Sequence, residues 1–62
     1  MCESNVFLEK DGKKQEVMKD VMKMMVDGNK ITCIGILGEK KEVIGKIKIA
    51  DLAHHEILLE SV

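Results

Sequence analysis

The sequence contains no arginine and only one aromatic residue, Phe7. Ten lysines stand against eleven acidic residues, which gives a net charge of −1. Domains that bind nucleic acids usually carry a basic excess, arginines that grip phosphates and aromatic side chains that stack on bases. The composition therefore argues against a nucleic-acid binder, although a small barrel that binds RNA through its lysines stays open as an alternative.

Long apolar runs are also missing. Every uninterrupted apolar stretch is far shorter than the roughly 20 residues that a membrane-spanning helix needs, and Glu3 stands where a secretory signal would carry basic residues. We therefore expect a cytoplasmic protein without a membrane segment. Thiols stay reduced in that compartment, so Cys2 and Cys33 are expected to be free rather than joined in a disulfide.

Proline is absent, so glycine marks the turns. Asp11-Gly12 and Asp27-Gly28 are typical of tight turns, because glycine accepts a positive φ and aspartate can hydrogen-bond its own backbone. Gly38, which precedes three charged residues, predicts another turn. A chain of 62 residues is expected to form a single domain, residues 1–62. Domains this small usually need a disulfide, a metal or a partner subunit; with reduced thiols, a metal or a partner remains.

Four segments have the pattern of β-strands. Ser4–Lys10 and Glu42–Ile49 alternate in polarity, as half-buried strands do. Lys30–Leu37 is rich in β-branched residues, and Glu56–Glu60 contains a short apolar run. Short strands separated by turns predict an all-β fold, specifically a small single-domain β-barrel of short antiparallel strands.

Residues Gln15–Val26 fit that pattern least well. Their apolar side chains fall at helical spacing, and Gly28 stands where a helix would end. Periodicity alone favours an amphipathic helix slightly over a strand. The apolar residues concerned are Val17, Met18, Val21, Met22 and Met25.

Cys2 is the most informative position for chemistry. A small residue after the initiator methionine allows that methionine to be removed, which would expose an N-terminal cysteine. The thiolate, the free amine and the next backbone amide would then lie within chelating reach, and such sulfur and nitrogen donors suit Ni(II) or Cu(II). The alternative is a spare thiol in a frayed terminus.

The other candidate residues have simpler interpretations. Cys33 lies in an apolar run and is expected to be a small core residue. His54 and His55 are adjacent in an expected turn and are interpreted as polar turn residues, with an auxiliary metal role as the alternative. No nucleophile with a partner base, glycine-rich phosphate loop or usefully spaced carboxylate pair is evident, so we predict that the protein is not an enzyme.

The chain resembles the CooT family, small nickel-binding proteins linked to the maturation of carbon monoxide dehydrogenase. The likeness covers nearly the whole chain at the right length, and the Met-Cys start is its most distinctive motif. The matching segments are Met1–Leu8, the turns at Asp11-Gly12 and Gly28, the stretch around Asp20-Val21, Gly45–Leu52 and Ile57–Glu60.

This resemblance implies a small all-β barrel, a homodimer and a Ni(II) ligand at Cys2. It also favours the extended form of Gln15–Val26 over the helix. We therefore predict an accessory protein that captures or delivers nickel for a nickel enzyme, with one metal held between the Cys2 residues of two chains. A small barrel that binds RNA and an interaction module without a metal are the alternatives.

Overall fold

The computed structural model describes residues 3–62, which form six β-strands in a single sheet. The strand order across the sheet is β4-β3-β2-β1-β6-β5, and the prediction of an all-β fold is confirmed. Among residues 3–62, no helix is long and apolar enough to cross a membrane. The strands are β1 (Ser4–Lys10), β2 (Lys13–Asp27), β3 (Lys30–Gly35), β4 (Lys40–Ile44), β5 (Lys46–Asp51) and β6 (Glu56–Glu60).

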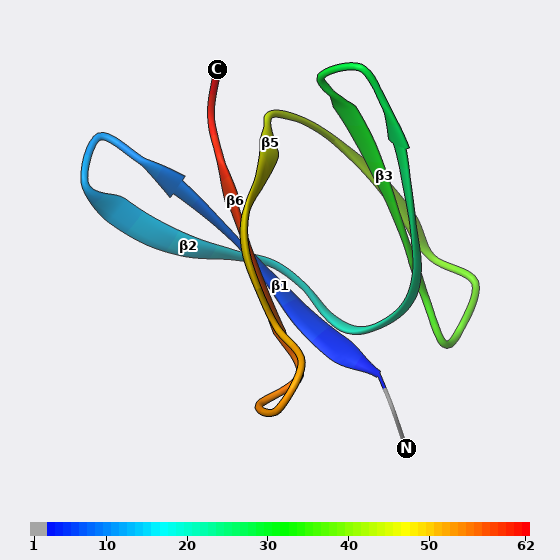
Figure 1. Cartoon of the computed structure of the whole chain (residues 1–62). Coiled ribbons are helices and arrows are strands. Elements are labelled where there is room, and N and C mark those ends of the chain that lie inside the picture. Colours follow the sequence, from blue (N-terminus) through cyan, green and yellow to red (C-terminus); the bar gives the residue numbers. More distant parts are fainter. Residues whose placement is uncertain (1–2) are drawn as a thin grey trace.

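The sheet curls strongly, so one of its faces is wrapped around a small core (Figure 1). Partly buried apolar residues from β1, β2, β4 and β6 pack against that core. Elsewhere on the sheet, the Lys14 ammonium lies over the Phe7 ring, 4.5 Å from its centroid. The core residues are Val6, Val21, Ile31, Cys33 and Leu59, none more than 5% exposed.

One pair of strands departs from the predicted antiparallel arrangement. β1 and β6, the first and last strands, run parallel from Asn5 opposite Glu56 to Glu9 opposite Glu60. Parallel neighbours need a long crossover between them, and here all of β2 to β5 lies in that crossover. The pairing brings Leu59 beside the centre of β1 and so joins the two ends of the described chain in one core.

The sheet curls towards a barrel but does not close, so the predicted barrel goes slightly too far. β4 and β5 are its two edge strands, and no ladder joins them. Glu42–Ile49, predicted as one strand, is divided at Gly45 into the end of β4 and the start of β5. The Gly45 N–H donates a hydrogen bond to the Asn29 carbonyl, 2.8 Å away. This bond holds the connection between β4 and β5 against the turn between β2 and β3.

The strand β2 confirms the extended interpretation of Gln15–Val26, and the helical alternative is wrong. Its pairing slips by one residue at two places along β1 and at one place along β3. Each bulge inserts one residue and therefore moves the next inward-facing position along by one. Met18, Val21 and Met24, which face the core, are consequently three residues apart instead of two. A bulged strand thus imitates the spacing of a helix.

The bend in β2 is centred on Asp20, which has a φ of 54°. Its N–H donates to the Asn5 side-chain oxygen at 3.2 Å, and its carbonyl accepts a hydrogen bond from the Ile36 N–H at 3.1 Å. These two contacts connect the bend to β1 on one side and to the end of β3 on the other. As a result β2 pairs with β1 along its first half and with β3 along its second half.

We expect Gly45→Ala to lower the free energy of unfolding by roughly 1–3 kcal/mol, as overpacking does. A Cβ at Gly45 would lie 2.5 Å from the Glu60 carbonyl oxygen, and this backbone atom cannot swing aside as a side chain could. Urea denaturation measures the loss. The matched control is Gly28→Asn, where the φ of +62° suits asparagine and no atom lies within 4 Å. Equal losses in both variants would contradict the proposed close approach.

Candidate metal site

The site is built where β1 begins. Ser4 lies opposite Val21 on β2, and Val21 lies opposite Gly35 on β3. On the other side of β1, the Asn5 N–H donates to the His55 carbonyl at 2.9 Å. His55, Ser4, Val21 and Gly35 therefore form a line across four consecutive segments of the sheet, which we call the N-terminal row. The N-terminal row thus comprises the start of β1, the bend of β2, the end of β3 and the turn before β6.

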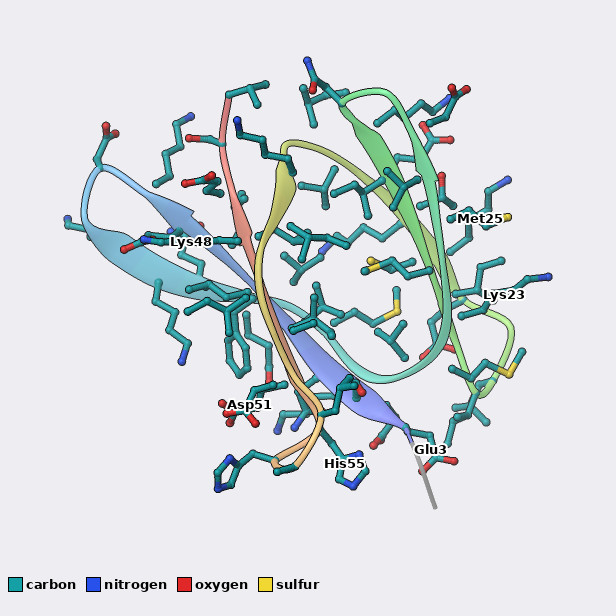
Figure 2. The ribbon with its side chains drawn as sticks, in the orientation of Figure 1. Glu3, Lys23, Met25, Lys48, Asp51 and His55 are labelled. Atoms are coloured by element: carbon teal, nitrogen blue, oxygen red, sulfur yellow. The ribbon has the colours of Figure 1, made fainter. Side chains whose placement is uncertain are left out.

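Glu3 directly precedes β1, and Figure 2 shows it at the same end of the molecule as His55. Cys2, the predicted metal ligand, lies outside the described residues 3–62. It is nonetheless joined to Glu3 by a peptide bond, and consecutive Cα atoms are only about 3.8 Å apart. Glu3 is thus the described residue that directly follows Cys2 in the chain.

The two adjacent histidines have different surroundings. The His54 backbone N–H donates to one carboxylate oxygen of Asp51 at 3.2 Å, and its ring Nδ1 lies 3.0 Å from the other. The hydrogen bond from the His54 side chain holds the pKa of Asp51 below its ordinary value. The imidazole of His54 is 75% exposed. This histidine thus serves the turn after β5, in agreement with its interpretation as a polar turn residue.

His55 belongs to the N-terminal row instead. Its φ of 55° lies in the left-handed region, which histidine adopts more often than most non-glycine residues do. This conformation ends the turn and aims the His55 carbonyl at the start of β1. Figure 2 shows His55 between Asp51 and Glu3 at the end of the molecule where β1 begins.

A hollow of about 150 Å³ opens beside the N-terminal row, lined by residues of β1, β2 and β6 that include Ser4, Met24 and Ile57. Three solvent-exposed apolar side chains directly follow members of the row, and we call them the apolar rim. Met22 follows Val21 of the row and also lines the hollow. Ile36 and Leu37 directly follow Gly35 of the row. Met22, Ile36 and Leu37 are 60%, 47% and 87% exposed, respectively.

The described residues do not make a complete metal site by themselves. Within residues 3–62, no group of three or more His, Cys, Asp or Glu side chains is arranged to hold a metal. His55 and Glu3 do offer an imidazole and a carboxylate, and imidazole nitrogen is a good ligand for Ni(II). The sequence supplies a thiolate one residue before Glu3, so the chemistry of the donors fits a nickel site completed by Cys2.

Cys33 has no part in this arrangement. It is fully buried in the core, where it lies on β3 opposite Met24 of β2 and Lys41 of β4. Burial raises the pKa of its thiol above the ordinary value of 9.0. The prediction of a small core residue is therefore confirmed, since a protonated buried thiol is a poor metal ligand.

Comparison with known proteins identifies the family. Residues 1–60 match the family model of the CO dehydrogenase accessory protein CooT. The chain belongs to the CooT family. The family is one of accessory proteins, which agrees with the prediction that the chain is not an enzyme.

Two relatives and one solved structure resemble the chain. An uncharacterized protein of Methanocaldococcus jannaschii is 37% identical over 60 residues, covering 97% of this chain and 98% of its own. A second uncharacterized protein, from Archaeoglobus fulgidus, is 42% identical over 43 residues, covering 69% of this chain and 96% of its own. The crystal structure of a protein assigned as CooT in Carboxydothermus hydrogenoformans superposes with a TM-score of 0.89 at 30% identity, covering 98% of both chains.

Sequence reasoning did not find the apolar rim or the difference between His54 and His55. The sequence places Met22 in one continuous apolar pattern, whereas in the structure this residue lies at the bulge between Val21 and Lys23 and is exposed. For the histidines a local signal did exist. An Asp three residues before His54 is typical of a turn in which the carboxylate caps the later N–H.

We expect the Cys33→Ala substitution to reveal the buried thiol through the pH dependence of stability. Near pH 7 the variant should be less stable by roughly 1–2 kcal/mol, because buried volume is lost. The folded protein holds the Cys33 proton more tightly than the unfolded chain does, so this contribution is complete below pH 9.0 and is lost as the pH rises above it. The stability difference between wild type and variant should therefore shrink from pH 8 to pH 10.

Urea denaturation at each pH, with Cys2→Ser as the matched thiol control, measures this difference. The control should keep a constant offset from wild type over that range if Cys33 is the thiol responsible. A Cys33→Ala offset that stays constant up to pH 10 would contradict a raised pKa in the core.

Proposed function

We propose that this chain carries Ni(II) on Cys2 and supplies it to carbon monoxide dehydrogenase as a cytoplasmic accessory protein. The observation that carries the proposal is the family match, which begins at residue 1 and thus includes the Met-Cys start. The site geometry supports it, because Glu3, the residue after Cys2, directly precedes Ser4 of the N-terminal row, which also contains His55. A reducing cytoplasm would keep the Cys2 thiol available for metal.

The chemistry of capture and release follows from the donors. A thiolate binds Ni(II) strongly, and the backbone or terminal nitrogens beside Cys2 can supply a second donor to form a chelate. Nickel must displace the thiol proton, so affinity falls as the pH is lowered. A site on a strand end, rather than in the buried core, leaves the metal accessible to a client protein that offers more donors.

We further propose that two chains form the site together. Each chain contributes only one cysteine outside the core, so a two-thiolate site requires a homodimer. The apolar rim supports this arrangement, because its three side chains are exposed and directly follow Val21 and Gly35 of the N-terminal row. Two copies that pack their rims together would bury these side chains and bring the two chain starts towards each other.

The surface charges favour this proposal over RNA binding. Lys48 Nζ lies 2.7 Å from Glu9 Oε1, and Lys30 Nζ lies 3.4 Å from Glu42 Oε2. These two lysines are paired with carboxylates, and the net charge of −1 leaves no basic excess that could follow a phosphate backbone. The mixed surface gives no specific support to the RNA-binding alternative.

We expect Cys2→Ser to abolish tight Ni(II) binding and leave the sheet folded, because nickel can displace the proton of a thiol but not that of a serine hydroxyl near neutral pH. Nickel titration followed by thiolate-to-nickel absorption measures binding, and native mass spectrometry measures stoichiometry. Wild type should take up one nickel per dimer. Cys33→Ala is the matched control and should bind nickel as wild type does. Unchanged nickel affinity in Cys2→Ser would refute the proposed function.

We expect Leu37→Lys to dissociate the homodimer, because a charge would be placed in the apolar rim. The matched control is Ile44→Lys, since Ile44 is 61% exposed but lies at the far end of β4 from the rim. Sedimentation at micromolar concentration should show monomeric Leu37→Lys and dimeric Ile44→Lys. A dimer that survives Leu37→Lys but dissociates in Ile44→Lys would place the interface elsewhere.

A further inference from the structure

The sheet leaves two edge strands open, β4 and β5, each of which pairs with a neighbour on one side only within residues 3–62. Open edges of this kind can pair with strands of other molecules and so lead to aggregation. Each edge strand carries two lysines, Lys40 and Lys41 in β4 and Lys46 and Lys48 in β5. In each of these strands one lysine is bound to a strand beyond the immediate neighbour.

Lys41 connects β4 to the first half of β2, which pairs with β1 and not with β3. Its Nζ donates a hydrogen bond to the Val17 carbonyl, 3.3 Å away. Val17 is the residue that a bulge inserts between Glu16 and Met18, so it has no partner in the register of β1 and β2. The ammonium of the edge strand therefore binds a backbone acceptor at an irregular point of β2.

The side chain of Lys41 starts from the core side of β4. Lys41 lies directly opposite Cys33 of β3, and residues opposite each other in an antiparallel pair lie on the same face of the sheet. Cys33 is fully buried in the core. All five residues of β4 pair regularly with β3, so no bulge interrupts this edge. A strand added beside β4 would have to bury the Lys41 ammonium, and burying a charge is costly.

The other edge strand, β5, is interrupted by a bulge. Lys48 is its extra residue, between Ile47 and Ile49, and has no partner in the register of β5 and β6. Bulges at a sheet edge disturb the regular pairing that an added strand would need. The Lys48 Nζ lies 2.7 Å from Glu9 Oε1 on β1, beyond β6. Figure 2 shows Lys48 reaching from β5 towards the hairpin of β1 and β2.

We propose that Lys41 and Lys48 protect the two open edges of the sheet from pairing with further copies of this chain. Each lysine ties its edge strand to a strand beyond the neighbour and places a charge where an incoming strand would pair. The inference depends neither on nickel nor on the homodimer. It assigns different roles to the lysines of one strand, because Lys40 and Lys46 make no hydrogen bond or ion pair within residues 3–62.

The test compares Lys41→Met with Lys40→Met, and Lys48→Met with Lys46→Met. Methionine keeps a long, flexible side chain and removes the charge. Every variant loses one positive charge, so an effect of net charge alone would be equal within each pair. Lys41→Met and Lys48→Met should form assemblies that grow with time, measured by light scattering, and that bind thioflavin T. Lys40→Met and Lys46→Met should stay as soluble as wild type.

Hydrogen exchange tests the contact of Lys41 in dilute, unaggregated protein. The β4 amides that bond to β3 should exchange about 2- to 10-fold faster in Lys41→Met, as loss of one hydrogen bond allows. Lys40→Met should exchange as wild type does. Lys41→Arg keeps a cation that can reach the Val17 carbonyl, so it should restore both the solubility and the slow exchange.

Thermal unfolding of each variant checks that it is folded before the comparison is made. Folded Lys41→Met and Lys48→Met that stay as soluble as their controls would overturn the inference. Equal aggregation of all four methionine variants would also overturn it, since charge alone would then keep the chain soluble. Lys48→Met, whose contact with Glu9 lies on the surface, supplies the same comparison if Lys41→Met does not fold.

Discussion

The bend of β2 at Asp20 is the constraint on which the arrangement of the other strands depends. A strand of 15 residues in a flat sheet would continue along a single pair of neighbours. Here the Asn5 side chain and the Ile36 N–H bind the two backbone groups of Asp20, so the bend is held between β1 and β3. The curl that results from this bend encloses the core, and it also brings the start of β1, the end of β3 and the turn before β6 into the N-terminal row.

The sequence predicts much of this fold because most of its strands follow simple patterns. β1, β3 and β6 fall within the predicted segments, and the Asp-Gly turns lie where expected, with positive φ at Gly12 and Gly28. Periodicity does not identify β2 as a strand, because its bulges change the spacing of the core-facing side chains from two residues to three. Its extended form was favoured only by the resemblance to CooT. The break at Gly45 is invisible locally, since it depends on the Glu60 carbonyl, which is distant in sequence.

The candidate site was predictable in its chemistry but not in its surroundings. The start Met-Cys indicates a sulfur donor by residue type alone. The cap that Asp51 provides to the His54 N–H left a local signal in the sequence, whereas the place of His55 beside Asn5 depends on the parallel pairing of β1 and β6. No local pattern reveals which strands of a sheet become neighbours after a crossover of four strands. The apolar rim is hidden for a similar reason, since a bulge decides which face Met22 occupies.

The parallel pairing of the first and last strands also sets the order of events during synthesis. Until Glu56–Glu60 has emerged from the ribosome, β1 has a neighbour on one side only, and the Asn5 N–H has no carbonyl to bind. Contacts between such distant parts of a chain form late in folding. The N-terminal row therefore assembles only after Glu56–Glu60 has been synthesised, and a chain truncated before β6 would carry the Met-Cys motif without a complete row.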